Sequence, residues 1–279
     1  HARRFLEYTA QNRIALDGLW GRLDQRGRIS ASVLVVPGAG RTAMVFATRP
    51  ITAADARPIG ELIDRACREL SPTDVHLAQV LVDPAEPFER EAFLAGGFQD
   101  LAALSYLERP VPRGRVDDSG KVNWPADSEL VSYGAALHDA MVQVLDASYE
   151  HTLDCPDLRG LRRTEDILAG HLASGLHDPQ LWTMLRIDGR WAGALLLNPS
   201  AGHQSIELVY LGLAAWARGR GLGQRLLRHG LELVRGRPER AINLAVDEAN
   251  APAIALYRRE GFRPVLRRLA LIRPVRQHA

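Results

Sequence analysis

The stretch that decides the fold runs from Leu208 to Gly223 and reads LVYLGLAAWARGRGLG. Its first six residues are apolar and β-prone, and its last six contain three glycines directly before a segment with helical spacing. A strand that enters a glycine-rich turn and then a helix forms an anion-binding site, because the first helical N–H groups lack intrahelical partners and the helix dipole is positive there. We therefore predict that this turn binds phosphate.

Two arginines strengthen this prediction. Arg218 and Arg220 add full positive charge to the turn, and the glycines of the turn let a phosphate approach the backbone closely. The turn does not have the G-x-G-x-x-G spacing of a dinucleotide fold, nor the Gly-Lys-Ser/Thr of a nucleoside triphosphatase loop. These two absences remove the main competing phosphate sites. We predict that the turn binds the pyrophosphate of a coenzyme, and a plain tight connection without a ligand stays the alternative.

Length and composition set outer limits on fold and function. A chain of 279 residues favours two domains. The net charge of +2 is too small to indicate nucleic acid or an anionic membrane, and no apolar run approaches the ~18 residues of a membrane span. The two cysteines, Cys67 and Cys155, have no metal-ligand spacing, which favours free thiols in a reducing cytoplasm. We expect no metal site.

The hydrophobic patterns predict an alternation of strands and helices. Two hairpins are indicated, one around residues 37–40 and one around Asp188-Gly189. An imperfect helical stripe runs from Arg3 to Leu23. The other predicted helices lie at about 52–70, 88–95, 137–148, from 164 onward, 222–234 and 252–260, and the other strands at about 75–82, 101–107, 129–133, 204–213, 242–246 and 262–272.

A polar segment rich in proline and glycine divides the chain. Residues 110–125 contain little that a core could bury. We therefore expect an N-terminal domain over residues 1–112, a linker over 113–125 and a C-terminal domain over 126–279.

The two halves repeat each other. The segment from Phe93 to Phe98 stands in the same place as the segment from Tyr257 to Phe262, and each lies between a buried strand and a final strand. A hairpin, a long helix, a strand, a short helix, Gly-Phe and a strand recur in the same order. We interpret this as two copies of one α/β fold. The N-terminal strand-to-helix turn, Thr48 to Asp55, contains no glycine, so we expect its phosphate site to be missing.

A second motif lies downstream of the glycine turn. Asn250 to Phe262 reads N-x-x-A-x-x-L-Y-x-x-x-G-F, and Arg218 to Gly223 reads R-x-x-G-x-G. Together they resemble motifs A and B of the GCN5-related N-acetyltransferase (GNAT) superfamily. The resemblance covers Glu129 to about Ile272, while the first half matches only the order of elements. It implies two tandem GNAT-like domains, each a mixed, mostly antiparallel sheet flanked by helices, with a degenerate N-terminal copy.

The resemblance also implies a cosubstrate and its site. Acetyl-CoA would lie between two splayed strands, with its pyrophosphate on the backbone of the glycine turn. Asn250 matches the position that holds the pantetheine side in many relatives. The implied cofactor-binding residues are Leu211, Leu213, Arg218, Gly219, Arg220, Gly221, Leu222, Gly223, Gln224 and Asn250.

Catalysis would be carried by two side chains. Tyr257 matches the general acid of the family, and a phenol with a pKa of ~10 is a reasonable donor to a thiolate whose conjugate acid lies near ~8.5–9.5. Glu207 stands eleven positions before Arg218, where some relatives keep a glutamate that activates the amine through water. Strand alternation would place Glu207 on the same face as Val209, Leu211 and Leu213. The alternatives are a packed core tyrosine and a solvent-facing strand residue.

The reaction predicted for this chain is acetyl transfer to a primary amine of a small molecule or peptide, in the cytoplasm, by a monomer or homodimer without nucleic acid or membrane partners. Three other interpretations stay open. The tandem arrangement is similar to that of the mycothiol synthases within this superfamily. A non-catalytic acyl-CoA-binding module would keep the fold without turnover. A longer acyl donor such as succinyl-CoA would need a positive cluster near the thioester.

Overall fold

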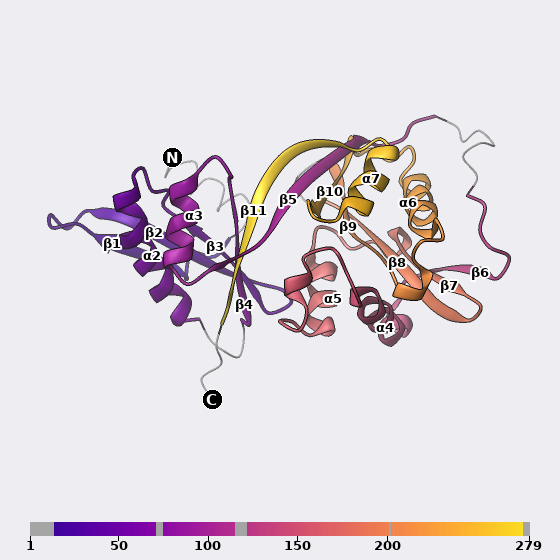
Figure 1. Ribbon diagram of the computed structural model, residues 1–279, viewed down its shortest axis with the longest axis horizontal. Coiled ribbons are helices and arrows are strands. Elements are labelled where there is room, and N and C mark those ends of the chain that lie inside the picture. The colour runs from indigo at the N-terminus through magenta and orange to yellow at the C-terminus, as the bar shows by residue number, and fades with distance from the viewer. Residues whose placement is uncertain (1–13, 71–74, 115–121, 201, 203, 276–279) are drawn as a thin grey trace. The chain divides into compact units, whose positions relative to one another are not determined.

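The computed structural model describes residues 14–70, 75–114, 122–200, 202 and 204–275. They form two compact units: unit 1 is residues 1–103 with 268–279, and unit 2 is residues 104–267. Each unit is a mostly antiparallel sheet flanked by helices, as predicted (Figure 1). The elements are β1 (Leu19–Leu23), β2 (Ile29–Gly38), β3 (Thr42–Ala47), α2 (Ala53–Arg68), β4 (Leu77–Val82), α3 (Pro87–Ala95), β5 (Gln99–Pro110), β6 (Ser128–Ser132), α4 (His138–Tyr149), α5 (Thr164–Ala173), β7 (Trp182–Ile187), β8 (Arg190–Pro199), β9 (Ser205–Leu213), α6 (Leu222–Leu233), β10 (Ala241–Asp247), α7 (Ala251–Arg259) and β11 (Arg263–Pro274).

Unit 1 has the strand order β1-β2-β3-β4-β11. Its one parallel pair among the described residues joins β3 to β4, and this pairing covers only Thr42–Met44 against Leu77–Gln79. Helices α2 and α3 pack on the sheet through side chains such as Ile59, Ile63 and Phe93, which are at most 5% exposed.

Unit 2 has the strand order β5-β10-β9-β8-β7-β6 and helices on both faces. Alternating residues of β8 separate the two layers. Leu195 and Leu197 belong to a core shared with α6 and α7, whereas Ala194 and Leu196 belong to a second core shared with α4 and α5. Period-two alternation in a strand buried on both sides explains this division.

Strand β5, the last strand of the N-terminal half of the sequence, contributes residues to the sheet of unit 2. Strand β11, the last strand of the C-terminal half, contributes residues to the sheet of unit 1. Residues Leu104–Pro110 of β5 pair antiparallel with β10, and residues Leu269–Pro274 of β11 pair antiparallel with β4. The compact units therefore differ from the contiguous segments expected at 1–112 and 126–279. A hydrophobic pattern predicts a strand but not its partner, because pairing is a long-range choice. Residues 115–121 of the expected linker lie outside the described residues.

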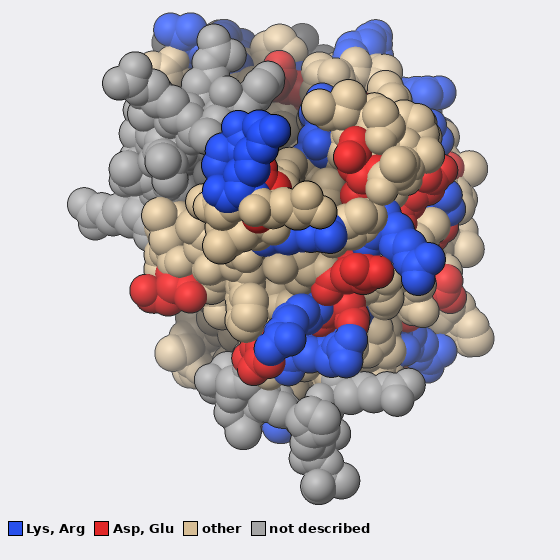
Figure 2. Space-filling view, turned by 90° about the vertical axis from the view of Figure 1, so that its left-hand side faces the viewer, with Lys and Arg blue, Asp and Glu red and all other residues tan. Residues whose placement is uncertain are grey.

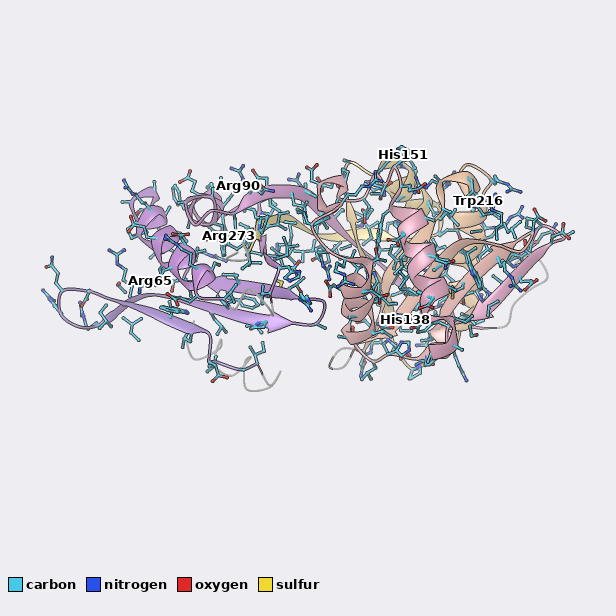
Figure 3. All side chains as sticks on the ribbon, turned by 90° about the horizontal axis from the view of Figure 1, so that it is seen from below. Arg65, Arg90, His138, His151, Trp216 and Arg273 are labelled. Carbon is cyan, nitrogen blue, oxygen red and sulfur yellow. The ribbon has the colours of Figure 1, made fainter. Side chains whose placement is uncertain are left out.

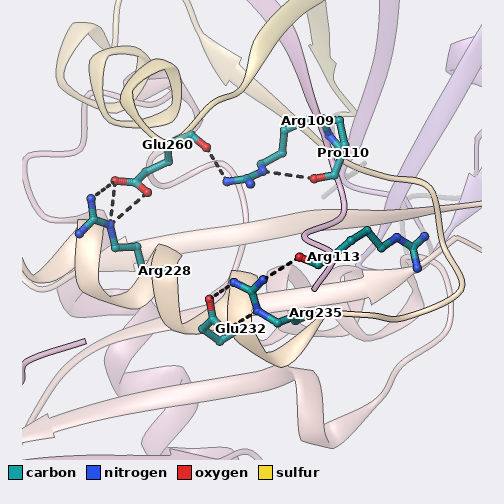
Figure 4. Close-up of polar contacts among 7 residues, drawn as sticks. All are labelled: Arg109, Pro110, Arg113, Arg228, Glu232, Arg235 and Glu260. Atoms are coloured by element: carbon teal, nitrogen blue, oxygen red, sulfur yellow. Dashed lines mark hydrogen bonds and ion pairs between the residues drawn. The ribbon is translucent and has the colours of Figure 1, made fainter. Parts of the chain in front are cut away.

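Two arginines at equivalent places in the repeat lie on the two exchanged strands, β5 and β11. Arg109 and Arg273 each follow the Gly of a Gly-Phe pair by twelve residues. In unit 2, Arg109 Nη1 donates to the carbonyl of Glu260 at the end of α7 (Figure 4). In unit 1, Arg273 Nη1 donates to the carbonyl of Gly96 at the end of α3, at 2.5 Å. Each exchanged strand thus caps the C-terminus of a helix, whose last carbonyls lack helical partners.

The helix predicted from Arg3 to Leu23 is wrong in the residues that the structure describes. Residues 1–13 lie outside the described residues, and Leu19–Leu23 form strand β1, which pairs antiparallel with β2. Tertiary pairing with β2 overrides the imperfect helical stripe, which Gly18 and Gly21 had already weakened. Among the helices of the described residues, none combines the length and apolar character that a membrane span requires.

On the face of the molecule drawn in Figure 2, acidic and basic side chains are intermixed. Ion pairs of unit 1 include Arg49 with Glu86 at 2.8 Å and Arg28 with Asp24 at 3.1 Å. The described part of this face therefore carries no continuous field of one sign, which is the feature that a polyanion would bind.

Candidate active site

Two parallel strands of unit 2, β9 and β10, pair over only part of their length, and the unpaired stretch between them is called the gap. Strands β9 and β10 pair only over Ser205–Glu207 and Ala241–Asn243. Beyond Glu207, the remaining residues of β9 pair with β8 alone. Backbone N–H and C=O groups of a buried strand need hydrogen-bond partners, so the edge of β9 from Leu208 to Leu213 can pair with an extended ligand.

A β-bulge changes which way the side chains of β9 point. Leu208 pairs with Leu197 and Tyr210 pairs with Leu196, so Val209 is an extra residue without a partner on β8. Leu208, Leu211 and Leu213 consequently pack in the α6/α7 core, whereas Val209 and Tyr210 pack in the α4/α5 core. The expectation that Glu207 shares a face with Val209, Leu211 and Leu213 is therefore wrong for Leu211 and Leu213, because the bulge shifts the alternation by one residue, whereas Val209 packs on the α4/α5 side together with Glu207.

The glycine turn leads from β9 into α6 as predicted. Gly219 and Gly221 have φ of +72° and +73°, and Gly221 is the N-cap of α6. A Cβ at either position would meet no atom within 4 Å, so the backbone conformation and not crowding requires glycine. The first turn of α6 contains no acidic side chain. Its N–H groups are therefore not neutralised by a carboxylate of that turn, which leaves them suited to an external anion.

The other predicted residues of this turn differ in exposure. Arg220 is exposed, whereas Leu222 is buried in the core. Gly223 lies against Leu213 and Leu256, and a Cβ added to it would be at an ordinary contact distance of 3.7 Å from both side chains. Gln224 donates through Nε2 to Glu260 Oε1 at 2.6 Å. Its side chain thus joins α6 to α7 alongside the Arg228–Glu260 ion pair in Figure 4, which leaves its backbone N–H as the group available to the turn.

The Arg218 side chain donates hydrogen bonds to three backbone carbonyls. Its Nε donates to the carbonyl of Leu213 at 3.1 Å, Nη1 to that of His151 at 3.0 Å and Nη2 to that of Ser148 at 2.7 Å. These carbonyls belong to the end of β9, the loop after α4 and the last turn of α4. The guanidinium therefore connects three segments of unit 2.

Tyr257 lies on α7 and is 8% exposed. Its ring makes an edge contact with Phe262, with a centroid distance of 5.7 Å. Burial raises the pKa of Tyr257 above its ordinary value, and the nearby Asp154 carboxyl and Tyr210 phenol raise it further. The phenol is therefore protonated at neutral pH, in an apolar setting where a proton donor would act.

Asn250 is the N-cap of α7, and its side chain accepts from the N–H of Ala253 at 3.3 Å. Burial raises the pKa of Asp154, and a hydrogen bond from the Asn250 side chain offsets part of this rise. The structure thus gives Asn250 a role in ordering α7 and the adjacent loop. Its predicted contact with pantetheine stays a prediction.

Asp247 at the end of β10 and Asp154 in the loop after α4 are linked by two hydrogen bonds, each from a backbone N–H to a carboxylate. Asp154 Oδ1 accepts from the N–H of Asp247, and Asp247 Oδ2 accepts from the N–H of Cys155, both at 3.0 Å. Burial raises the pKa of Asp154. The sequence pattern predicted a site role for neither residue, because 93 positions separate them and no local motif joins them.

Glu207 lies at the narrow end of the gap, on the α4/α5 face. Its Oε2 accepts from Ser174 Oγ at 2.8 Å, at the end of α5. The same face carries a row of aromatic rings: Tyr149 lies 6.0 Å from Tyr210, and Tyr210 lies 5.5 Å from His171, between centroids. No sequence pattern predicts this row, since its members come from three separate elements.

Exposed side chains frame the site. Figure 3 shows His151 and Trp216 on unit 2, where His151 contributes its carbonyl to Arg218 and Trp216 receives the guanidinium of Arg190 over its ring at 4.5 Å. Among the described residues, no group of three or more His, Cys, Asp or Glu is arranged to hold a metal ion.

Comparison with known sequences agrees with this geometry. Residues 141–262 match the acetyltransferase (GNAT) family. A mycothiol acetyltransferase of Clavibacter michiganensis subsp. michiganensis is 40% identical over 103 residues, which cover 37% of this chain and 33% of that protein. A streptothricin acetyltransferase of Streptomyces lavendulae is 35% identical over 85 residues, covering 30% of this chain and 45% of that protein. The match thus spans about a third to a half of these relatives.

Solved structures share the fold over nearly the whole chain. A GCN5-related N-acetyltransferase from Sphaerobacter thermophilus has a TM-score of 0.62 at 18% identity, covering 94% of this chain and 82% of that one. A tandem GNAT protein from the clavulanic acid biosynthesis pathway has a TM-score of 0.53 at 20% identity, covering 96% and 86%. The GNAT match covers residues 141–262, which hold strands β9 and β10 and the glycine turn, so this part of the chain is similar in sequence to that family, and the likeness to solved structures adds the shared fold.

Proposed function

We propose that this chain is an N-acetyltransferase that uses acetyl-CoA to acetylate a primary amine. The observation that carries the proposal is the early separation of β9 from β10, next to a glycine turn that contains no acid. An unpaired strand edge beside an open helix N-terminus suits a ligand with an amide-containing arm and a diphosphate. Coenzyme A has both.

The chain's own groups divide the binding task. The N–H groups of residues 219–224 would hold the diphosphate, and the exposed Arg220 would add charge. The edge of β9 from Leu208 to Leu213 would pair with the amides of the pantetheine arm, and Leu213 would line the gap beside Gly223. This assignment keeps the predicted backbone contacts and leaves the Arg218 side chain in its bonds to protein carbonyls.

The bound acetyl-CoA would supply the activated thioester carbon. In the transfer, the N–C bond forms, the C–S bond breaks, the amine loses a proton and the sulfur gains one. Tyr257 would supply the proton to sulfur. Burial raises the pKa of its phenol, and the same burial makes a thiolate more basic, so the donor and acceptor stay matched.

Glu207 would receive the amine proton through water. Its carboxylate lies on the α4/α5 face, where Ser174 holds one oxygen. Val209 and Tyr210 next to the bulge pack in the core shared with α4 and α5, so the acceptor would enter from that side. A Glu207→Gln variant should lose turnover while its CoA affinity stays the same, and equal turnover would remove Glu207 from the mechanism.

The test is a thiol-release assay with acetyl-CoA and a panel of amines. The panel covers polyamines, aminoglycosides, amino acids, peptide N-termini, streptothricin and the substrate of mycothiol acetyltransferase. Amine-dependent release of CoA supports the proposal. Tight binding of acetyl-CoA without release by any amine would favour a non-catalytic acyl-CoA-binding module. Faster release of CoA from succinyl-CoA than from acetyl-CoA would show that succinyl-CoA is the preferred acyl donor.

The second candidate is the reaction of the mycothiol acetyltransferases. The identity of 40% over 103 residues favours it over other acceptors. In either case we propose that unit 1 is a degenerate copy that binds no CoA and completes the fold. Binding stoichiometry of one CoA per chain, measured by calorimetry, would support this, and two per chain would contradict it.

A further inference from the structure

We infer that Arg218 is a positioning residue that couples the coenzyme turn to the loop after α4, so that occupancy of the turn sets the position of the acceptor side of the site. The inference starts from three hydrogen bonds and rests on the proposed function only in its coupling step. Arg218 is the first residue of the R-x-x-G-x-G turn, yet its guanidinium donates to Leu213, His151 and Ser148. A guanidinium has five N–H donors in a rigid fork, and here it addresses three different segments.

The loop concerned covers residues 150–158 and is anchored at its start and near its middle. At the end of β9, Arg218 binds the carbonyls of Ser148 and His151. At the end of β10, the carboxylate of Asp247 accepts from the N–H of Cys155 in the loop, and the carboxylate of Asp154 in the loop accepts from the N–H of Asp247. These two strands are the ones that separate after Glu207, so the loop bridges the open end of the gap between them.

The loop backbone is held in a conformation that it would not adopt freely. His151 and Cys155 have φ of +51° and +45°, in the left-handed region that non-glycine residues rarely occupy. Such conformations persist where surrounding contacts determine them. The contacts here are the Arg218 bond to His151 and the Asp247 bond to Cys155. Loss of either anchor should therefore loosen the loop.

The position of Arg218 in the chain supplies the coupling. One residue separates its neighbour Gly219, with φ of +72°, from Gly221, the N-cap of α6. A diphosphate that orders the backbone of residues 219–224 would restrict Arg218, and through it the loop. The acceptor amine would then meet a formed site only after coenzyme has bound. Arg220, two residues further along, is exposed and directs its charge to solvent.

The test compares Arg218→Gln with Arg220→Gln in the full chain. Hydrogen exchange of residues 150–158 is measured with and without CoA, and CoA affinity is measured by calorimetry. We expect Arg218→Gln to speed exchange of the loop at least tenfold without CoA and to abolish its slowing by CoA, while affinity changes less than threefold. Arg220→Gln should weaken CoA binding and leave exchange of the free loop unchanged.

Two outcomes would overturn the inference. One is an Arg218→Gln variant whose affinity falls more than tenfold while its loop exchanges as in the wild type, since Arg218 would then bind the diphosphate directly. The other is wild-type loop exchange that CoA does not slow although CoA binds. If wild-type protein binds no CoA, the proposed function fails, and the exchange of the free loop in the two variants still decides whether Arg218 anchors it.

Discussion

The turn before α2 in unit 1 and the turn before α6 in unit 2 occupy the same place in the repeat and differ in chemistry. In unit 1, the Asp55 carboxylate accepts from the N–H groups of Thr52 at 2.8 Å and Ile51 at 3.2 Å. In unit 2, the equivalent helix begins at Gly221 with no acid in its first turn. One helix N-terminus already holds a carboxylate of its own, and the other is open to an external anion.

The two units also differ where the short helix follows. Phe93 of unit 1 stands where unit 2 has Tyr257, and both rings contact the phenylalanine after glycine, with centroid distances of 5.2 and 5.7 Å. The packing is the same, but unit 1 has no hydroxyl at this position. A copy that needs only to fold can replace the phenol by a phenyl ring, because the core requires the ring and the proposed chemistry requires the oxygen.

The largest effect should come from closing the open turn. Gly221→Asp introduces both a strained left-handed residue and a negative charge, so CoA affinity should fall more than a hundredfold by calorimetry. Gly27→Asp is a matched control, since Gly27 of unit 1 has φ of +73° and equally open surroundings. It should lose similar stability, about 1 kcal/mol, without changing CoA affinity. If the affinity for CoA is unchanged in the Gly221→Asp variant, the diphosphate does not bind at this turn.

The next largest effect should come from making unit 2 resemble unit 1 at the short helix. Tyr257→Phe keeps the ring and deletes the hydroxyl, so turnover should fall about 10²–10⁴-fold with CoA affinity within about threefold. The thiol-release assay measures the first and calorimetry the second. Equal turnover in the variant would show that the tyrosine, like Phe93, is a packing residue.

The exchanged strands allow the two units to be perturbed separately. Arg109→Met and Arg273→Met each remove a charged donor to a helix C-terminus, which should cost about 1–3 kcal/mol. Hydrogen exchange should rise in α7 for the first variant and in α3 for the second. Each variant serves as the other's control. The opposite assignment would show that each strand stays with its own half of the sequence.

The smallest effect concerns pH and the α4/α5 layer of unit 2. Burial lowers the pKa of His171 to about 4, and its Nε2 is enclosed without a hydrogen-bond partner among the described residues. The unfolded chain, with a histidine pKa near 6.5, binds this proton more readily, so stability should be lost as pH falls from about 6.5 to 4. In His171→Gln this loss should shrink by roughly 2 kcal/mol, measured by denaturant unfolding.

A His171→Gln variant whose stability falls with pH as steeply as that of the wild type would contradict this prediction. The pH dependence would then not arise from the buried ring beside Tyr210.

Sequence patterns predicted most of the fold and part of the site. The order of strands and helices, the repeat, and the glycine turn with Gly219 and Gly221 all follow from local signals, which act over a few residues. Strand β1 was mistaken for helix, because its apolar spacing was ambiguous and pairing with β2 decided the outcome. The Asp154–Asp247 pair and the ring of His171 beside Tyr210 depend on contacts between distant segments, for which the sequence carries no pattern.

The sequence by itself determined the open turn of unit 2 and its closed counterpart in unit 1, because φ at glycine and a capping carboxylate are local properties. Only the tertiary structure decided the rest. The bulge at Val209 set which face Glu207 occupies, since one extra residue reverses the alternation of a strand. Pairing of β5 with β10 and of β11 with β4 set the composition of the two units, and the fold around Arg218 brought its guanidinium to three backbone carbonyls.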